Sequence, residues 1–344
     1  MVQLVTGASG FIGRYLVEAL MARGEPVRLF DLRTPTWLSE VHLRVGKVEY
    51  VRGDVTYRPD LQRALQGVDT VYHLGALLLM AGDEARMKQV NVEGTRTLLT
   101  LAREAGVRKV VYTSTGMLYD QSRGRPTHED DPPRPSGPYG RSKREAEAAC
   151  RAAIEQGMEL AVLRPLFVIG PGRLGVMHLL FQRVRRGRPI YMVGDGSNRF
   201  HMIHAADVAQ ACILASRPGI SGFFNIGAAE PHTVRELMQA LKDHAGTDSE
   251  LRPLPRKLVR LGIETLELLK LAPIAPEQQA VAWQERVLDC SRAHETLGFR
   301  PRFTDIQAWQ ETYDWYLSLS GRTDHAADWP DGGILKFPLL DRLL

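Results

Sequence analysis

Short apolar runs alternate with amphipathic stretches along the first half of the chain. Val2 to Val5 make an apolar run long enough for a buried strand, and from Phe11 to Leu20 apolar residues recur at helical spacing. Further apolar runs follow at 26–32, 48–55, 69–76 and 109–112. Repetition of strand, helix and strand predicts an α/β fold built on a doubly wound parallel sheet.

The second half of the chain is less regular. Beyond about residue 165 the alternation weakens, and glycine–proline turns appear at 170–172, 187–189 and 194–196. We therefore expect a sheet domain over 1–165 with later returns near 200–228, a smaller substrate lobe mainly over 166–316, and a C-terminal tail over 317–344. The segment 124–138 is rich in proline, glycine and charge, which predicts a long surface loop.

Three glycines stand in the turn between the first predicted strand and the first predicted helix. The segment TGASGFIG places them at Gly7, Gly10 and Gly13. In this context the first permits a tight turn, the second lets the backbone approach a pyrophosphate, and the third lets the helix pack against the strand. The N–H groups of the helix's first turn, which includes Phe11 and Ile12, would then face a diphosphate. The sequence therefore predicts a Rossmann-type dinucleotide site.

A carboxylate ends the second predicted strand. In PVRLFDL this residue is Asp31, about twenty residues beyond the last glycine of the motif. A carboxylate there accepts hydrogen bonds from the adenosine ribose hydroxyls and repels the 2′-phosphate of NADP. Arg33 and Arg14 are close enough in the sequence to attract that phosphate instead. We favour NAD over NADP as the cofactor.

A tyrosine and a lysine occur four residues apart in YGRSK, at Tyr139 and Lys143. On a helix over about 139–157 they would stand on the same side, one turn apart. An ordinary tyrosine has a pKa of about 10 and is a poor base at neutral pH. A neighbouring ammonium favours the phenolate and lowers that pKa toward the working range. This pair predicts an acid/base site beside the dinucleotide.

Three hydroxyl-bearing residues, Thr113, Ser114 and Thr115, follow the buried run at 109–112. In a parallel sheet the carboxyl end of this strand faces the ligand crevice. A hydroxyl there can donate a hydrogen bond to the substrate oxygen whose proton Tyr139 takes or gives. At least one of the three hydroxyls is expected only to cap a turn.

The chain resembles the extended short-chain dehydrogenase/reductase family, in its NAD-dependent epimerase/dehydratase group. The resemblance covers roughly residues 1–316 and rests on the order and spacing of several motifs. Beyond TGASGFIG, Asp31, YTST and YGRSK, these are GDV with Asp54, YHLGA, NVEGT with Asn91, LRPLFVIGPG, GDGSNRFHMIHAADVA, FNIG at 224–227 and LDCSRAHETLGFRPRF. The resemblance implies a Rossmann-type sheet, a smaller C-terminal substrate lobe and bound NAD.

The resemblance also implies individual roles. Tyr139 is the acid/base, Lys143 its partner, and Thr115 the hydroxyl that polarises the substrate, with Ser114 as the alternative. The implied cofactor residues, beyond the glycines, are Phe11, Ile12, Asp31 and Arg33, then Asp54 and Val55 beside the adenine, Leu74, Gly75, Ala76, Asn91 and Thr113 along the cofactor groove, Tyr139 and Lys143, and Pro165 and Leu166 beside the nicotinamide. The implied substrate residues are Leu78, Ser114, Thr115, Met117 and Arg199.

Three hypotheses for the function follow. The leading one is an NAD-dependent epimerase or dehydratase-like enzyme that oxidises a secondary alcohol of a nucleotide-activated sugar. The second is a 3β-hydroxysteroid-dehydrogenase-like enzyme or ketoreductase acting on an apolar substrate. The third is a non-catalytic sensor that binds NAD, against which the presence of Tyr139, Lys143 and Thr115 argues.

Four departures separate the chain from nucleotide-sugar relatives. Those relatives usually carry an arginine four residues before the His204 position, whereas here Arg199 lies five before it and Phe200 fills the slot. The usual Arg-Pro-Gly-Asp stretch reads ERVLD, and the Tyr-Gly after the fifth strand reads Tyr-Asp. An apolar run, LLLMAGDE at 77–84, replaces a more polar segment. The displaced arginine and the apolar run favour the second hypothesis.

Charge and cysteine content limit the partners. The net charge of +4 is too small to indicate nucleic-acid binding. A cluster of arginines fits either a solvated helix end or a nearby anionic substrate, and comprises Arg183, Arg185, Arg186 and Arg188. The three cysteines, Cys150, Cys212 and Cys290, fit neither a disulfide framework nor a metal cluster. We expect a reducing compartment and no metal site.

No apolar run reaches the roughly 20 residues that span a bilayer, so we expect a cytoplasmic protein with a small-molecule substrate. By the resemblance we also expect a homodimer. The two helices that would pair with those of the partner lie over about 87–105 and 139–157. The C-terminal tail ends in the apolar segment ILKFPLLDRLL, for which two roles stay open: covering a groove of the same chain, or packing on the partner chain.

Overall fold

A computed structural model describes residues 1–38, 47–78, 83–119, 124–175, 177–261 and 284–319. In the sheet-forming part the elements are β1 (Val2–Thr6), α1 (Phe11–Ala22), β2 (Val27–Asp31), β3 (Val48–Arg52), α3 (Arg58–Ala64), β4 (Val68–His73), α4 (Glu84–Lys88), a π-helical segment (Gln89–Gly94), α5 (Thr95–Glu104), β5 (Lys109–Thr113), a 3₁₀ turn (Gly116–Leu118), α6 (Pro138–Glu155) and β6 (Glu159–Pro165). The later elements are β7 (Phe167–Ile169), α7 (Met177–Arg185), β8 (Ile190–Val193), β9 (Met202–His204), α8 (Ala205–Ala215), β10 (Gly222–Ile226), α9 (Val234–His244), β11 (Leu251–Leu254), a second π-helical segment (Ala293–Leu297) and α12 (Asp305–Leu319).

Seven strands form the main sheet, in the order β10-β6-β5-β4-β1-β2-β3, and every neighbouring pair is parallel. This confirms the predicted doubly wound α/β fold. The strand order reverses at β1, which pairs with β2 on one side and β4 on the other. In such sheets ligands bind outside the carboxyl ends of the strands at the reversal. The fold therefore predicts a ligand site at the carboxyl ends of β1 and its neighbour β4.

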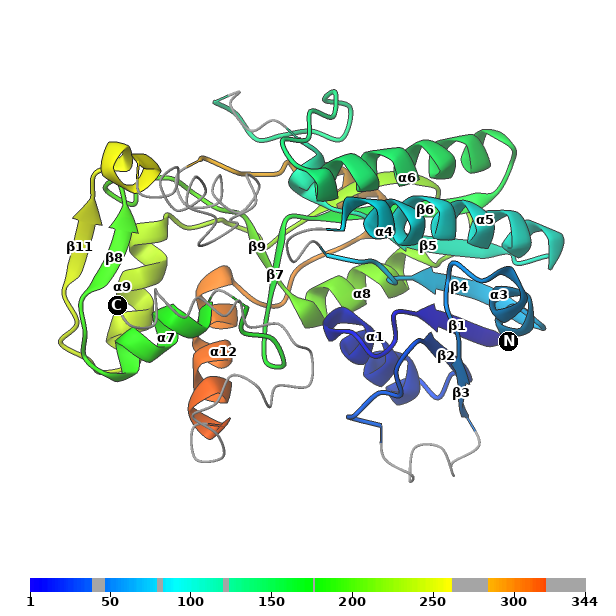
Figure 1. Cartoon of the computed structure of the whole chain (residues 1–344), viewed down its shortest axis with the longest axis horizontal. Helices are drawn as coiled ribbons and strands as arrows, with labels where there is room; N and C mark the ends of the chain where they lie inside the picture. Colours follow the sequence, from blue (N-terminus) through cyan, green and yellow to red (C-terminus); the bar gives the residue numbers. More distant parts are fainter. Residues whose placement is uncertain (39–46, 79–82, 120–123, 176, 262–283, 320–344) are drawn as a thin grey trace.

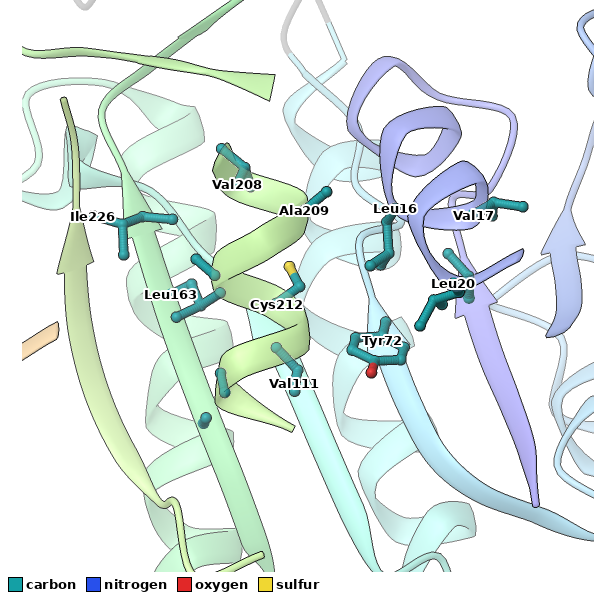
Figure 2. Packing of buried hydrophobic residues seen from close by; sticks show 14 of the residues in the cluster. Leu16, Val17, Leu20, Tyr72, Val111, Leu163, Val208, Ala209, Cys212 and Ile226 are labelled. Atoms are coloured by element: carbon teal, nitrogen blue, oxygen red, sulfur yellow. The ribbon is translucent and has the colours of Figure 1, made fainter. Parts of the chain in front are cut away.

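Helices cover both faces of this sheet (Figure 1). On one face α1 and α8 pack on the strands, and Leu16, Leu20 and Cys212 meet Tyr72 and Val111 in a continuous core (Figure 2). On the other face α3, α5 and α6 bury a second set of apolar residues. Burial on both faces explains why the sheet strands read as continuous apolar runs.

The helix predicted over 87–105 is interrupted. The structure has α4, then the π-helical segment, then α5. Within this stretch the Thr95 hydroxyl donates to the Asn91 carbonyl oxygen (2.7 Å). The Asn91 amide leaves the helix and exchanges hydrogen bonds with the backbone of Leu77. A π-turn adds a residue to the helical ladder, and periodicity alone does not reveal it.

A third core lies in the smaller part of the molecule. Residues of α7, β8, α9 and α12 pack together there, and Phe181, Leu237 and Trp309 are among them. The pair β7 and β9 runs between this part and the main sheet, to which β10 returns (Figure 1). The domain limits at 165/166 and 316/317 stay predictions. The tail from residue 320 lies outside the described residues, and within the described part no helix is long and apolar enough to cross a membrane.

Candidate active site

The glycine turn after β1 is closely packed. Gly7 has a φ of +70°, and a Cβ there would lie 2.7 Å from the backbone nitrogen of Gly75. A Cβ on Gly13 would lie 2.3 Å from the Gly7 carbonyl oxygen. Gly10, by contrast, is exposed, although a Cβ there would lie 3.2 Å from the Gly7 carbonyl oxygen. Glycine is thus required for the turn and for the packing of α1, as the sequence predicted.

The amino-terminal end of α1 carries no competing anion. Its N-cap, Gly10, makes no side-chain cap hydrogen bond, and the first turn with Phe11 and Ile12 holds no acidic residue. The loop after β7 lies beside the start of α1, because the Tyr15 hydroxyl donates to the Pro171 carbonyl oxygen (2.7 Å) and a Cβ on Gly172 would lie 3.5 Å from the Phe11 ring. The helix end therefore keeps its positive dipole and N–H groups for an anion.

The two acidic residues expected near the adenosine have different surroundings. Asp31, at the end of β2, accepts hydrogen bonds from the backbone N–H groups of Ser9 (3.0 Å) and Arg33 (3.3 Å). Asp54 accepts from the backbone and hydroxyl of Thr56 and from the Arg86 guanidinium (2.8 Å). Burial acts to raise the pKa of Asp54, but these hydrogen bonds outweigh it and the pKa is lowered. Asp31 is held beside the glycine turn, whereas the carboxylate of Asp54 is already engaged by Arg86.

Lys143 is fixed at the carboxyl end of β5. Its side chain is 2 % exposed, and its ammonium donates to the Thr113 carbonyl oxygen (2.8 Å) and to the Tyr112 hydroxyl (3.1 Å). Burial lowers the pKa of Lys143 to about 8, against the opposing effects of Cys150 and Glu147. The lysine is therefore still mostly charged at pH 7.

Tyr139 lies one helical turn before Lys143, in the first turn of α6. Pro138 stands at the start of this helix, where its fixed φ and missing N–H are tolerated. Tyr139 is half-buried, and its carbonyl oxygen accepts from the Ser142 hydroxyl (2.8 Å). The Asn91 amide in turn donates to that hydroxyl (3.0 Å). The start of α6 is thus linked to the loop after β4.

The three hydroxyls after β5 point to different partners. Thr113 contacts the Cys212 sulfur (3.9 Å), so its side chain faces α8. Thr115 accepts from the backbone N–H of Met117 (3.2 Å) and begins the 3₁₀ turn. The Ser114 hydroxyl is buried and has no hydrogen-bond partner among the described residues. The capping role expected for one hydroxyl falls to Thr115, while Ser114 keeps an unsatisfied group.

The remaining predicted cofactor and substrate residues lie at the ends of neighbouring strands. Pro165 ends β6, and Leu166 packs against Gly116 of the 3₁₀ turn. After β4, the loop that contains Leu74, Gly75 and Ala76 continues into Leu77 and Leu78, and these two leucines are 37 % and 44 % exposed. Val55 follows β3 and contacts Gly94. Parallel pairing brings these segments to one edge of the sheet.

The guanidinium of Arg199 is already paired with an acidic side chain. Its guanidinium forms an exposed ion pair with Glu285 (2.6 Å), whose carboxylate also accepts from the Arg199 backbone N–H. Arg286, the next residue, is instead buried, and its guanidinium donates to the sulfur of Met117 (3.0 Å) and the side chain of Gln284. The sequence reasoning overlooked Arg286, although it stands three residues before Asp289, the spacing of the Arg-Pro-Gly-Asp stretch.

A buried ion pair behind the site was also overlooked. Arg164 of β6, 1 % exposed, donates twice to Glu147 of α6 (2.9 and 2.5 Å). It also donates to the Tyr119 hydroxyl and to the Glu129 carbonyl oxygen (3.0 Å). The signal was present in the sequence, because an arginine inside an apolar strand run needs a buried partner. Among the described residues no cluster of His, Cys, Asp or Glu could hold a metal ion.

Known proteins are similar to this chain in sequence and in fold. The profile of the NAD dependent epimerase/dehydratase family matches residues 3–227. The uncharacterized protein y4nG of Sinorhizobium fredii is 35% identical over 333 residues, which cover 94% of this chain and 82% of that protein. The 3 beta-hydroxysteroid dehydrogenase/Delta 5→4-isomerase of Mycobacterium tuberculosis is 31% identical, with 92% and 90% covered. The structure of UDP-glucose 4-epimerase from Thermus thermophilus with NAD superimposes with a TM-score of 0.72 at 28% identity, covering 92% of this chain and 99% of that one.

Proposed function

The chain belongs to the NAD-dependent epimerase/dehydratase family, and we propose that it oxidises and reduces a secondary alcohol of a nucleotide-activated sugar with NAD. The main support for the proposed oxidation and reduction is the position of the Lys143 side chain. Its ammonium is hydrogen-bonded to the last two residues of β5. Tyr139 lies one helical turn before Lys143 on α6, and Thr115 follows the end of β5 by two residues in the adjoining loop. A phenol, an ammonium and a hydroxyl at one edge of the sheet are the groups that carbonyl reduction requires.

The residues present fit NAD. The packed Gly7 and the uncapped first turn of α1 would hold the diphosphate, and Asp31 would hold the adenosine ribose through its hydroxyls. Its negative charge favours NAD over NADP. When bound, NAD supplies a hydride acceptor or donor at the nicotinamide ring. Relatives and structural neighbours in this family bind NAD, among them the Thermus thermophilus epimerase.

The proton chemistry falls to Tyr139. As a phenolate it takes the proton of the substrate hydroxyl onto its own oxygen, and in the reverse direction it returns that proton. The nearby Lys143 ammonium stabilises the phenolate by charge attraction. The Thr115 hydroxyl, or the unsatisfied Ser114 hydroxyl beside it, donates to the substrate oxygen as negative charge develops there.

A cation supports the nucleotide-sugar assignment. The Arg286 guanidinium is buried and reaches Met117, which follows Thr115 on the 3₁₀ turn. A guanidinium offers five donors in a planar fork that matches phosphate oxygens. We propose that Arg286, rather than Arg199, meets the diphosphate of the substrate.

An apolar alcohol or ketone is the second candidate substrate. Arg199 is paired with Glu285, and Phe200 is buried in its place. Leu77 and Leu78 are exposed beside the expected substrate position. Exposed neighbouring leucines favour an apolar partner, and the Mycobacterium tuberculosis relative is named a steroid dehydrogenase.

Two measurements separate these assignments. Denaturing the purified protein and assaying for released NAD distinguishes an epimerase, which we expect to retain NAD, from a reductase with an empty site. Thermal-shift titrations with UDP- and dTDP-sugars, with sterols in parallel, then identify the substrate class. Stabilisation by a nucleotide sugar supports the proposal, and stabilisation by sterols alone transfers it to the second candidate.

A pair of variants sharpens the substrate test. Arg286→Met removes the buried guanidinium, and we expect it to weaken nucleotide-sugar binding at least tenfold, because a charge-assisted hydrogen bond contributes about 1.5–3 kcal/mol. Arg199→Met is the matched control, since its guanidinium is exposed and already paired. If only the control variant loses affinity, the assignment to Arg286 is wrong.

We further propose a homodimer and a reducing compartment. The helices α5 and α6 lie next to each other on one face of the sheet, and their outer sides would form the interface (Figure 1). Cys150, Cys212 and Cys290 are all free and buried, which fits the cytoplasm. Light scattering on the purified protein tests the dimer, and a monomeric mass refutes it.

A further inference from the structure

Three polar side chains lie side by side across the sheet beneath the candidate site. Thr6 of β1 is paired with His73 of β4, and His73 with Tyr112 of β5. All three are nearly inaccessible to solvent. Because paired residues in parallel strands point to the same face, they form one row, which α5 and α6 cover. The family's acid/base chemistry, as described above, uses none of them.

The hydrogen bonds along this row have a fixed direction. The Thr95 hydroxyl gives its one proton to the Asn91 carbonyl oxygen (2.7 Å), so toward His73 Nε2 (3.0 Å) it can only accept. His73 therefore carries its proton on Nε2, and its Nδ1 accepts from the Thr6 hydroxyl (2.7 Å). The Thr6 oxygen then accepts from the backbone N–H of Gly75 (3.3 Å). Each proton in the row has one possible place.

The imidazole stays neutral in this arrangement. Burial, and next the charge of Lys143, lower the pKa of His73 to about 3. A protonated ring would present a donor at Nδ1, so the Thr6 hydroxyl could no longer donate there and its proton would lose this acceptor. Gly75, at the far end of the row, packs on Gly7 of the dinucleotide turn. The row therefore begins at the glycine turn.

The near end of the row is Tyr112. Its hydroxyl accepts from the Lys143 ammonium (3.1 Å), which also lies 4.6 Å from the centre of the Tyr112 ring. Burial raises the pKa of Tyr112 well above its ordinary value, so its phenol keeps its proton. Its ring also packs against the His73 imidazole, with the ring centres 5.4 Å apart, and this contact links Tyr112 to the row. Tyr112 thus joins Lys143 to His73.

We propose that Tyr112 is a positioning residue for Lys143, and that the buried row of Thr6, His73, Thr95 and Tyr112 fixes the lysine's ammonium relative to the glycine turn. Tyr112 does not touch the reacting atoms. Its oxygen favours the charged form of the lysine in a place where desolvation opposes that charge. Its importance for turnover rests on the proposed function, but its effect on Lys143 does not.

Other charged or titratable groups face Lys143 as well. Glu147 and Cys150 lie on the same helix, and both raise the pKa of Lys143. On the sheet side, His73 faces the lysine and is neutral. The charge of Glu147 is shared, because its carboxylate also forms an ion pair with Arg164. The half-buried Tyr139 stands one turn away. Among these groups, Tyr112 is the neutral side chain whose oxygen accepts directly from the ammonium.

The test is the pKa of Lys143 in Tyr112→Phe, measured by NMR titration of protein with ¹³C-labelled lysine, the signal being assigned with Lys143→Met. This substitution removes the acceptor oxygen and keeps the ring beneath the ammonium. We expect the midpoint to fall by about one pH unit, because the substitution removes a hydrogen bond to the charged form of the lysine and leaves the burial that opposes that charge. An unchanged midpoint overturns the proposal.

Tyr72→Phe is the matched control. Tyr72 is a buried tyrosine on β4 that belongs to the core on the opposite face of the sheet (Figure 2). We expect the titration midpoint of Lys143 to be unchanged in this control variant. An equal fall of that midpoint in both variants shows a nonspecific effect and overturns the proposal. If Tyr112→Phe does not fold, Thr95→Val and Thr95→Ser replace it: the first should lower the midpoint and the second should restore it. A midpoint unaffected by Thr95→Val refutes the row.

The titration needs neither NAD nor a substrate. A negative result therefore leaves the proposed function standing, and a failed nucleotide-sugar titration leaves the row standing. A second readout is the pH dependence of NADH binding, followed by NADH fluorescence. We expect the loss of affinity at alkaline pH to begin about one unit lower in Tyr112→Phe than in Tyr72→Phe. Equal profiles contradict the link between the row and the cofactor site.

Discussion

The ion pair between Arg164 and Glu147 makes a quantitative prediction about stability. Both side chains are almost completely buried, and together they connect β6 to α6. In Arg164→Met the carboxylate of Glu147 loses both of its hydrogen bonds from the guanidinium. Tyr119 retains its other partner, the side chain of Asn225 (3.1 Å). The principal consequence is therefore an orphaned buried carboxylate on the helix that carries the proposed catalytic pair.

The magnitude has an upper bound from proton uptake. An unpaired buried carboxylate escapes its charge by binding a proton, and for a glutamate with an ordinary pKa of about 4.3 this costs about 3.7 kcal/mol at pH 7. Breaking a buried pair by removing one partner typically costs about 3–5 kcal/mol. We expect Arg164→Met to lower the free energy of unfolding by about 3 to 4 kcal/mol at pH 7. Because the folded variant binds a proton that the unfolded chain does not, this loss should shrink as the pH falls from 7 toward 5.

The assay is urea denaturation of four proteins: the parent, Arg164→Met, Glu147→Leu and the double variant. Glu147→Leu leaves a guanidinium that cannot lose its proton, so we expect it to be at least as damaging as Arg164→Met. The double variant removes both charges and should recover most of the loss, so single losses of about 3 to 4 kcal/mol each and a residual loss of about 1 kcal/mol give a coupling energy of about 5 to 7 kcal/mol. A coupling below about 1 kcal/mol, or a loss in Arg164→Met that is independent of pH, refutes the reasoning.

Three further predictions concern the proposed site. Gly13→Ala places a methyl group 2.3 Å from the Gly7 carbonyl oxygen, so NADH affinity, measured by fluorescence titration, should fall at least tenfold; unchanged affinity contradicts the packed turn. Asp31→Asn keeps an acceptor for the Ser9 N–H but removes the negative charge, so titration with NADPH should show tighter binding than in the parent, and an NADPH affinity no higher than the parent's rejects this basis of selectivity. Tyr139→Phe should lower kcat by about 10²–10⁴ while NADH binding changes less than twofold, and surviving turnover disproves its role as the acid/base.

Much of the fold followed from the sequence because both of its signals are local. Buried parallel strands read as apolar runs and the covering helices have a period of about 3.6 residues, so 2–5, 26–32 and 109–112 were identified as strands. The glycine turn was predictable for the same reason, since one backbone turn requires all three glycines within eight residues. The π-turn before Thr95 was not predictable, because it changes the helical ladder by one residue without breaking the apolar pattern.

The polar interior behind the site was less predictable. Tyr139 and Lys143 are neighbours because one helix fixes their spacing, and YGRSK displays that spacing directly. Thr6, His73 and Tyr112 become neighbours only through strand pairing across 106 positions of sequence. Single-sequence patterns do not specify which strands pair or in what register. Arg286 was overlooked for a different reason, since comparison with the Arg-Pro-Gly-Asp stretch directed attention to the missing glycine rather than to the arginine that is present.

The buried polar groups of α6 explain how the position of Tyr139 is set. The helix is bonded to β5 through Lys143 and to β6 through Glu147, one turn later on the same side. A single anchor would leave the helix free to rotate about that point, whereas two anchors on neighbouring strands fix both its rotation and its position along its axis. Apolar packing alone tolerates small sliding movements, and catalysis by proton transfer requires placement within about 0.5 Å. Charged residues in the interior of this helix are therefore best understood as the means by which the sheet holds the tyrosine in place.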